Sequence, residues 1–189
     1  MQLNDGYLEL FIGPMFSGKT SALLEIYKKC TFCNIPIAVI NHSSDTRYNE
    51  DEMLSSHDKV MIPCIKTQYL TNIWYNENSE QHLKLKKAQV ILINEGQFFE
   101  DLYAVVTDML KYNKQIYICG LDGDFERKKF GQILDLIPLC DKVNKLTSLC
   151  NICKNGKPGI FSMRLTSETQ QTLIGIDNYA PVCRKCYSS

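Results

Sequence analysis

Residues 13–20 read Gly13-Pro14-Met15-Phe16-Ser17-Gly18-Lys19-Thr20, and this stretch decides the fold. The apolar run 8–12 precedes it, and a helix-like run follows over residues 21–30. The glycines let the backbone curl so that successive N–H groups point inward, which makes an anion cradle at a helix N-terminus. In a Walker-A P-loop of this pattern the lysine reaches the β- and γ-phosphates, and the threonine hydroxyl contacts a magnesium ion. The strand-loop-helix setting therefore favours a nucleoside-triphosphate site over a structural glycine turn.

The composition narrows the class of partner. The 189 residues suit one ordinary domain with a small appendage, and 21 basic side chains balance 21 acidic ones. A zero net charge gives no broad electrostatic footprint for a nucleic acid, so we expect a small-molecule partner. Residues 1–5 lack the features of a signal peptide, and no apolar run of about 18 residues occurs. These features predict a soluble cytoplasmic protein without a membrane partner.

Short β-branched runs alternate with longer amphipathic stretches along the first two-thirds of the chain. This alternation predicts an α/β fold of the P-loop NTPase type, with a mainly parallel sheet flanked by helices. The expected strands are residues 8–12, 36–41, 60–65, 90–93 and 116–119, and the expected helices are residues 21–32 and 102–112. Ligand groups should gather at the carboxyl ends of these strands.

Two polar segments, residues 41–59 and 121–131, interrupt the alternation and are candidate functional loops, with plain solvated connections as the alternative. Around residue 149 the composition changes to cysteine, glycine and short polar runs. We therefore predict a P-loop ATP-binding and catalytic domain over residues 1–148 and a zinc-binding subdomain over residues 149–189.

Two Cys-x-x-Cys pairs, 29 residues apart, lie in the second unit. Four thiolates at this spacing can surround one tetrahedral zinc ion, and a closed structural site is favoured over a redox disulfide. The predicted ligands are Cys150, Cys153, Cys183 and Cys186. Cys30 and Cys33 are expected to be core or surface thiols. Cys64, Cys119 and Cys140 lie in apolar surroundings and are expected to be small buried apolar residues.

An acidic residue follows the apolar run 90–93, at Asn94-Glu95. In a doubly wound sheet this strand would lie beside the P-loop strand, so Glu95 could accept the proton of a substrate hydroxyl. The alternative is a solvated carboxylate at a strand end, which the presence of a P-loop disfavours.

Taken in order, the motifs resemble those of the thymidine kinases of the cellular and poxviral type. The matching segments are residues 13–20, Asp45-Thr46-Arg47-Tyr48, Ser56-His57-Asp58, Glu95-Gly96-Gln97-Phe98-Phe99, Leu121-Asp122-Gly123 with Phe125 and Arg127, Phe130-Gly131, and Tyr179. They extend from the first expected strand to the last cysteine pair, which makes the match more specific than either the P-loop or the cysteine pairs alone.

The resemblance implies transfer of the γ-phosphoryl group of ATP to the 5′-hydroxyl of thymidine, with residues 13–20 binding ATP and Glu95 as the base. Neutralising charge would come from Lys19, from magnesium held through Thr20, and from Arg47 or Arg127. The resemblance also implies an apolar base slot lined by Met15, Phe98, Leu121, Phe125, Phe130 and Tyr179. A loop over residues 166–181, anchored by the zinc unit, would cover this slot. Without the family, the aromatic residues would indicate ordinary core.

The family further implies a homotetramer that thymidine triphosphate inhibits. One position departs from its pattern, because Asn94 stands where the family usually has an aspartate that helps to hold hydrated magnesium. An amide keeps an oxygen acceptor but loses the charge. Asp45 is the candidate to compensate, with a flexible solvated loop around it as the alternative.

Other functions remain open at this point. A P-loop ATPase could use its zinc knuckles to bind nucleic acid, although the neutral charge disfavours it. A nucleoside monophosphate kinase would need several arginines for its acceptor phosphate, and the chain has only Arg47, Arg127, Arg164 and Arg184. A broader deoxynucleoside kinase and an inactive regulatory homologue are further alternatives, and retention of Lys19, Thr20 and Glu95 argues against the inactive form.

Overall fold

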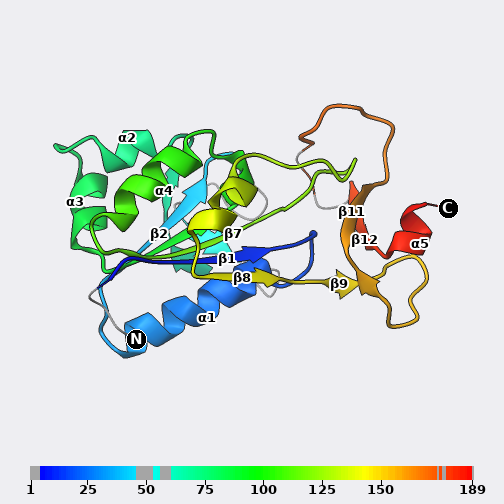
Figure 1. The fold of residues 1–189 in the computed structure, drawn as a ribbon, viewed down its shortest axis with the longest axis horizontal. Coiled ribbons are helices and arrows are strands. Elements are labelled where there is room, and N and C mark those ends of the chain that lie inside the picture. Colours follow the sequence, from blue (N-terminus) through cyan, green and yellow to red (C-terminus); the bar gives the residue numbers. More distant parts are fainter. Residues whose placement is uncertain (1–4, 46–52, 56–60, 174, 176–177, 189) are drawn as a thin grey trace.

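The structure is a computed structural model that describes residues 5–45, 53–55, 61–173, 175 and 178–188. A six-stranded sheet with strand order β5-β2-β6-β7-β1-β8 forms its centre (Figure 1). The strands are β1 Tyr7–Ile12, β2 Ile37–His42, β5 Ile65–Thr67, β6 Val90–Asn94, β7 Gln115–Gly120 and β8 Lys142–Lys145. Every neighbouring pair is parallel, so the predicted α/β fold is confirmed.

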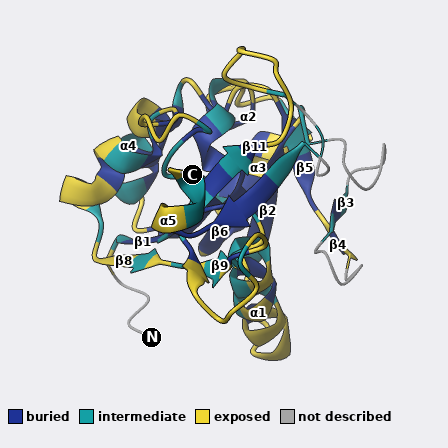
Figure 2. Cartoon of the chain, turned by 90° about the vertical axis from the view of Figure 1, so that its right-hand side faces the viewer, coloured by how far each residue is buried: buried dark blue, intermediate teal, exposed yellow. Residues whose placement is uncertain are grey.

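Helices cover both faces of this sheet. The helical elements are α1 Lys19–Phe32, α2 Thr71–Trp74, α3 Glu80–Lys87, α4 Leu102–Leu110, the short 3-10 helices η1 Gly96–Phe98 and η2 Ile133–Leu139, and α5 Arg184–Tyr187. Leu23 and Leu24 of α1 pack into the core of one face, whereas Leu85 of α3 and Leu102 of α4 pack into that of the other. Figure 2 shows buried residues concentrated in the central strands and exposed residues on the outer side of α1.

The structure corrects one predicted strand. Of the expected strand 60–65, residue 60 lies outside the described residues. Residues 61–65 do not form a single strand, because β4 Met61–Pro63 pairs antiparallel with β3 Met53–Ser55, and β5 pairs separately with β2. Pro63 lacks a backbone N–H and ends β4, which separates the two strands. The sequence analysis also missed β8, whose short polar sequence Lys142–Lys145 carries little strand signal. It missed α2, α3 and η2 as well.

The C-terminal unit lies beyond the carboxyl ends of the central strands (Figure 1). It contains two antiparallel pairs, β9 Ser148–Leu149 with β10 Pro158–Gly159, and β11 Phe161–Arg164 with β12 Tyr179–Val182. A separate small apolar cluster packs around the cysteines of this unit. The domain boundary expected between residues 148 and 149 falls within β9 and stays a prediction.

Within the described residues, no helix is both long enough and apolar enough to span a bilayer.

Candidate active site

The P-loop joins the end of β1 to the start of α1. Gly13 and Gly18 have φ angles of 146° and 83°, which non-glycine residues rarely adopt. A Cβ at Gly13 would lie 2.3 Å from the carbonyl oxygen of Leu146, so the chain also needs glycine there for a close backbone approach. Because α1 begins at Lys19, its first N–H groups face the loop and can bind an anion.

Two P-loop side chains already make contacts inside the site. The Lys19 ammonium donates to the carbonyl oxygen of Pro14 at 2.6 Å and to the Ser17 hydroxyl at 3.4 Å. The Thr20 hydroxyl donates to Asn94 Oδ1 at 3.4 Å, which connects the P-loop to the end of β6. Both side chains line one pocket, which also contains Glu95.

A buried row of polar side chains continues from Thr20 across the sheet. Asn94 Nδ2 donates to Asn41 Oδ1 at 2.9 Å, and Asn41 Nδ2 donates to Asp45 Oδ2 at 3.1 Å. Cys119 Sγ donates to Asn94 Oδ1 at 2.9 Å. We call Thr20, Asn94, Asn41 and Asp45 the polar row. Asp45, which we expected to compensate for Asn94, is therefore connected to Asn94 through Asn41.

Two arginines were also expected on the phosphate side, and the structure describes only Arg127, which it does not bring to the P-loop. Arg47 lies outside the described residues, as do the motif segments 46–48 and 56–58. Arg127 stacks its guanidinium over Tyr187 at 4.2 Å and near Phe161 at 5.7 Å from the ring centroids. Both rings belong to the C-terminal unit, so Arg127 holds the 121–131 loop against that unit.

Glu95 follows directly after β6. The expectation that this strand lies beside the P-loop strand is wrong, because β7 lies between β6 and β1. Glu95 has a φ of 55° and a ψ of 42°, a left-handed conformation that is uncommon for a side chain with a Cβ and that recurs at functional sites. The residue is 9% exposed and lines the same pocket as Lys19. The sharp turn at Glu95 therefore directs a carboxylate into the site instead of continuing the strand.

Gln97 orients this carboxylate. Its Nε2 donates to Glu95 Oε2 at 2.6 Å, and its Oε1 accepts a hydrogen bond from the backbone N–H of Leu121 at 2.9 Å. One buried amide thereby ties η1 to the loop that follows β7. The sequence analysis quoted Gln97 within a motif but gave it no role, because its two partners come together only in the folded sheet.

His42 lies at the carboxyl end of β2, beside the aromatic residues after Glu95. Its ring packs edge-on against Phe99 at 4.8 Å and tilted against Phe98 at 5.5 Å. Burial lowers the pKa of His42, although a backbone hydrogen bond with Gln68 and the nearby carboxylate of Glu95 oppose that shift. A neutral His42 therefore supports Phe98 at neutral pH. The sequence analysis did not identify this residue.

The residues expected to hold the base share one pocket. All six, Met15, Phe98, Leu121, Phe125, Phe130 and Tyr179, line the pocket that also contains Lys19, Thr20, Asp45 and Glu95. Phe98 and Phe130 pack edge to face at 5.5 Å. The Met15 N–H donates to Ser162 Oγ at 2.9 Å, so the P-loop is also tied to β11. The pocket thus has a phosphate end at the P-loop and an apolar end among the aromatic rings.

A segment of the C-terminal unit also lines the pocket. It lies between β11 and β12, and we call its described residues, 165–173, 175 and 178, the covering loop. Gln171, Thr172, Leu173 and Gly175 of this loop line the pocket. The expected loop, residues 166–181, was too long at its C-terminal side, because β12 begins at Tyr179 and pairs with β11.

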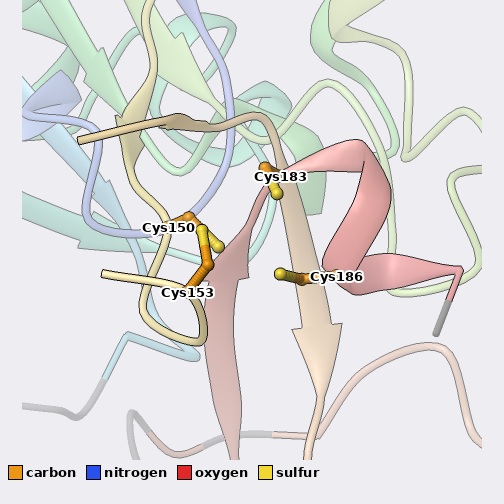
Figure 3. A group of neighbouring side chains, drawn as sticks. All are labelled: Cys150, Cys153, Cys183 and Cys186. Atoms are coloured by element: carbon orange, nitrogen blue, oxygen red, sulfur yellow. The ribbon is translucent and has the colours of Figure 1, made fainter. Parts of the chain in front are cut away.

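The four predicted zinc ligands come together. Figure 3 shows Cys150 and Cys153 in the turn after β9 facing Cys183 and Cys186, which lie at the end of β12 and in α5. Their sulfur atoms lie within 4.8 Å of one another. Tetrahedral zinc with Zn–S bonds of about 2.3 Å needs sulfurs separated by about 3.8 Å, so this donor set fits zinc after a small contraction.

The backbone favours the thiolate at two of the four cysteines, whereas burial raises the pKa of Cys153 and Cys186. Hydrogen bonds from the backbone of Cys153, and then of Cys183, lower the pKa of the Cys150 thiol to about 6. The backbone of Cys186 lowers the pKa of Cys183 in the same way. Thiolates are the form that binds metal.

The other cysteines are free thiols. Cys30 and Cys64 are buried and Cys33 is exposed, as expected, whereas Cys140 is only half-buried and not fully buried as expected. Cys119 was expected to be a small buried apolar residue, and it also has a polar contact and a place on the pocket wall.

Comparison with known proteins places the geometry in context. The family described as thymidine kinase matches residues 6–187. The chain is 38% identical to the thymidine kinase of Sheeppox virus (strain KS-1), over 96% of this chain and 97% of that protein. It is 36% identical to thymidine kinase 1 of Dictyostelium discoideum, over 97% of this chain and 78% of that protein. It is 38% identical to a thymidine kinase of Oryza sativa subsp. japonica, over 96% of this chain and 66% of that protein.

Proposed function

The chain belongs to the thymidine kinase family and phosphorylates thymidine, and we propose that it transfers the γ-phosphoryl group of ATP to the 5′-hydroxyl within the pocket described above. One observation carries the proposal. The P-loop residues Lys19 and Thr20, the carboxylate of Glu95 and six apolar or aromatic side chains all line this pocket. A nucleoside whose thymine ring lies in the apolar end would present its 5′-hydroxyl to Glu95, between the thymine ring and the phosphates.

The phosphate end binds the triphosphate through the P-loop backbone. Lys19 Nζ donates to the Pro14 carbonyl and the Ser17 hydroxyl, which hold the ammonium beside the loop. Phosphate oxygens would replace these neutral acceptors with charged ones, which form stronger hydrogen bonds. The N–H groups at the start of α1 add a favourable dipole for the same anion.

Magnesium fits the oxygen donors of the polar row. A hydroxyl from Thr20, an amide oxygen from Asn94 and a carboxylate from Asp45 are the oxygen ligands that this hard cation takes, directly or through water. The bound ion would neutralise charge on the transferred phosphoryl group. Asn41 joins Asn94 to Asp45 and so supplies a route by which the aspartate compensates for the missing charge.

Glu95 is proposed as the base. The transition state of phosphoryl transfer is loose, so catalysis depends on in-line positioning and on charge neutralisation more than on covalent help. The hydrogen bond from Gln97 at 2.6 Å holds the carboxylate in the pocket, where it would orient the 5′-hydroxyl and accept its proton. The left-handed turn at Glu95 fixes the direction from which that oxygen approaches.

The thymine ring is proposed to lie among Met15, Phe98, Leu121, Phe125, Phe130 and Tyr179. Aromatic side chains bury a flat ring well and tolerate little change in ring position. Zinc bound by the four cysteines would hold the ends of the C-terminal unit together and so support the covering loop.

Three further expectations from the family remain proposals. We propose a homotetramer and inhibition by thymidine triphosphate, and the second agrees with a pocket that offers both a base slot and a phosphate cradle to one ligand. We also propose a cytoplasmic location, where nine free thiols would stay reduced.

A panel of nucleosides tests the proposed function. The protein is incubated with γ-labelled ATP, magnesium and each of thymidine, deoxyuridine, deoxycytidine and deoxyadenosine, and the products are separated. Thymidine should give labelled 5′-monophosphate fastest. A comparable rate with a purine nucleoside would favour the broader deoxynucleoside kinase, and ATP hydrolysis without any labelled nucleotide would contradict the proposal.

A further inference from the structure

A buried arginine binds the main chain of the covering loop. Arg164 ends β11 and is 9% exposed. Its Nη1 donates to the carbonyl oxygens of Glu168 at 2.9 Å and Gln170 at 2.5 Å. Its Nη2 donates to the carbonyl oxygen of Gln171 at 3.1 Å and to the Tyr179 hydroxyl at 2.5 Å. One guanidinium thus satisfies three main-chain carbonyls that lie between the two strands of the hairpin.

The same guanidinium also contacts the wall of the base slot. It stacks over the ring of Phe125 at 3.8 Å and lies 5.1 Å from the centroid of Tyr179. Both rings line the pocket, whereas Arg164 itself lies behind them. A planar group with donors fixed in a fork can stack on a ring and bond several acceptors together, which a lysine ammonium cannot do.

A second contact ties the covering loop to the 121–131 loop. Gln171 Nε2 donates to Asp124 Oδ2 at 2.7 Å. The other oxygen of this carboxylate, Oδ1, accepts from the backbone N–H groups of Glu126 and Lys128, each at 2.9 Å. Asp124 is buried, and these hydrogen bonds fix its position. Gln171 is therefore held at two points, by its carbonyl and by its side chain.

We propose that Arg164 is a positioning residue for the nucleoside. Arg164 fixes the covering loop and the rings of Phe125 and Tyr179 in the arrangement that encloses the thymine ring. The Gln171–Asp124 hydrogen bond is the second contact that holds the covering loop in place. This inference rests on the proposed function. Because the contacts of Arg164 described above go to the covering loop and to these rings, its loss should weaken nucleoside binding while ATP binding and the chemical step persist.

Kinetics of Arg164→Lys test this role. The substitution keeps the charge but loses the fork and the stacking. We expect the KM for thymidine to rise about tenfold, on the order of the loss of one charge-assisted hydrogen bond. The KM for ATP and kcat should stay within about twofold of wild type. A fall in kcat with an unchanged thymidine KM would overturn the inference.

A matched pair of glutamines provides the second test. Gln171→Leu removes the side-chain hydrogen bond to Asp124. Gln170→Leu alters a neighbouring exposed side chain and keeps the main-chain carbonyl of residue 170, which accepts a hydrogen bond from Arg164. The thymidine KM should rise about threefold to fivefold in Gln171→Leu, on the order of one hydrogen bond, and stay at the wild-type value in Gln170→Leu. If Arg164→Lys does not fold, this pair decides the question, and equal thymidine KM values would overturn the proposal.

Ligand-induced stabilisation separates this inference from the proposed function. The Tm of each protein is measured alone, with thymidine, and with ATP and magnesium. The inference predicts that thymidine stabilises wild type and Gln170→Leu more than Arg164→Lys and Gln171→Leu, while ATP stabilises all of them alike. Equal losses for both ligands would make Arg164 a general structural residue and overturn its assigned role. Failure of thymidine to stabilise wild type would count against the proposed function instead.

Discussion

The two ends of the pocket are built in different ways. The phosphate end comes from the consecutive residues 13–20 and from the end of the nearby strand β6, so its geometry follows from local backbone conformation on a parallel sheet. The apolar end is assembled from the P-loop, the 121–131 loop and the covering loop, which side-chain bonds such as Gln171–Asp124 hold together. Damage to the first should stop chemistry, and damage to the second should weaken nucleoside binding.

Lys19→Ala should have the largest effect. The substitution removes the ammonium that would compensate the charge on the β- and γ-phosphates, so turnover should fall by at least about 10³-fold. The thymidine affinity should change little, because Lys19 lies at the opposite end of the pocket. Steady-state kinetics and a thymidine titration of the same preparation check both statements. Activity near the wild-type level would mean that the P-loop is not the working site.

Glu95→Gln should have the next largest effect, because Glu95 lies where the phosphate end and the apolar end of the pocket meet. The amide cannot accept the 5′-hydroxyl proton, and kcat should fall by roughly 10²–10⁴-fold, the usual contribution of a general base. Binding of ATP and of thymidine should persist, because neither the P-loop nor the base slot is altered. A nearly normal kcat would remove Glu95 from the mechanism.

Cys183→Ser should show the clearest difference between the two ends of the pocket, because it should weaken thymidine binding more than ATP binding. The variant lacks one of four predicted zinc ligands, and the metal-binding energy of a small unit is also its folding energy. We expect about one zinc per chain in wild type and less in the variant, with thymidine affinity weakened about tenfold or more and ATP affinity within about threefold. Cys33→Ser, at an exposed thiol outside the cluster, is the control.

Elemental analysis of freshly purified, reduced wild-type protein decides the premise of that prediction. Absence of zinc would refute the metal site. Equal weakening of both substrates in Cys183→Ser would show that the C-terminal unit supports the whole pocket and not only its apolar end.

Asn94→Asp should have the smallest effect and should act only on the phosphate end. A carboxylate restores charge beside Thr20, and an interaction of about 1 kcal/mol would lower the magnesium needed for half-maximal rate by up to about fivefold. The polar row opposes part of this gain, because the introduced carboxylate could no longer donate to Asn41 Oδ1 as the amide does. Nucleoside preference should not change.

Magnesium titrations of wild type and Asn94→Asp, at saturating ATP and thymidine, provide the measurement. Equal midpoints would show that Asp45 already compensates through Asn41. A lower rate for the variant at every magnesium concentration would show that the amide is required, and would reverse our assignment of Asn94 as a weakened metal residue.

The sequence signals that point to the phosphate end are local. A P-loop between a strand and a helix, an acid directly after a buried run, and paired cysteines all lie within a few residues. The parallel sheet followed from the alternation of apolar runs, and it is confirmed. The single strand expected over residues 60–65 was wrong because Pro63 has no N–H for a continuous ladder.

The contacts that support the site could not be read from the sequence. Arg164 was counted only as one of four arginines, and nothing near it in the chain indicates that it meets Phe125 and the covering loop. Asn41 and Gln97 act through partners at least 24 residues away, at Asn94 and Leu121. Arg127 was expected near phosphate, but the structure stacks it on Tyr187. Such contacts depend on tertiary packing, which local patterns do not encode.

Competition by a bisubstrate compound tests most directly whether one pocket holds both substrates. The compound joins the 5′-oxygen of thymidine to adenosine through a polyphosphate bridge, so that it can occupy the apolar end and the phosphate end together. We expect inhibition that is competitive against ATP and also competitive against thymidine, with tighter binding than either substrate. Inhibition that is competitive against only one of them would contradict the claim that the two ends form a single continuous site.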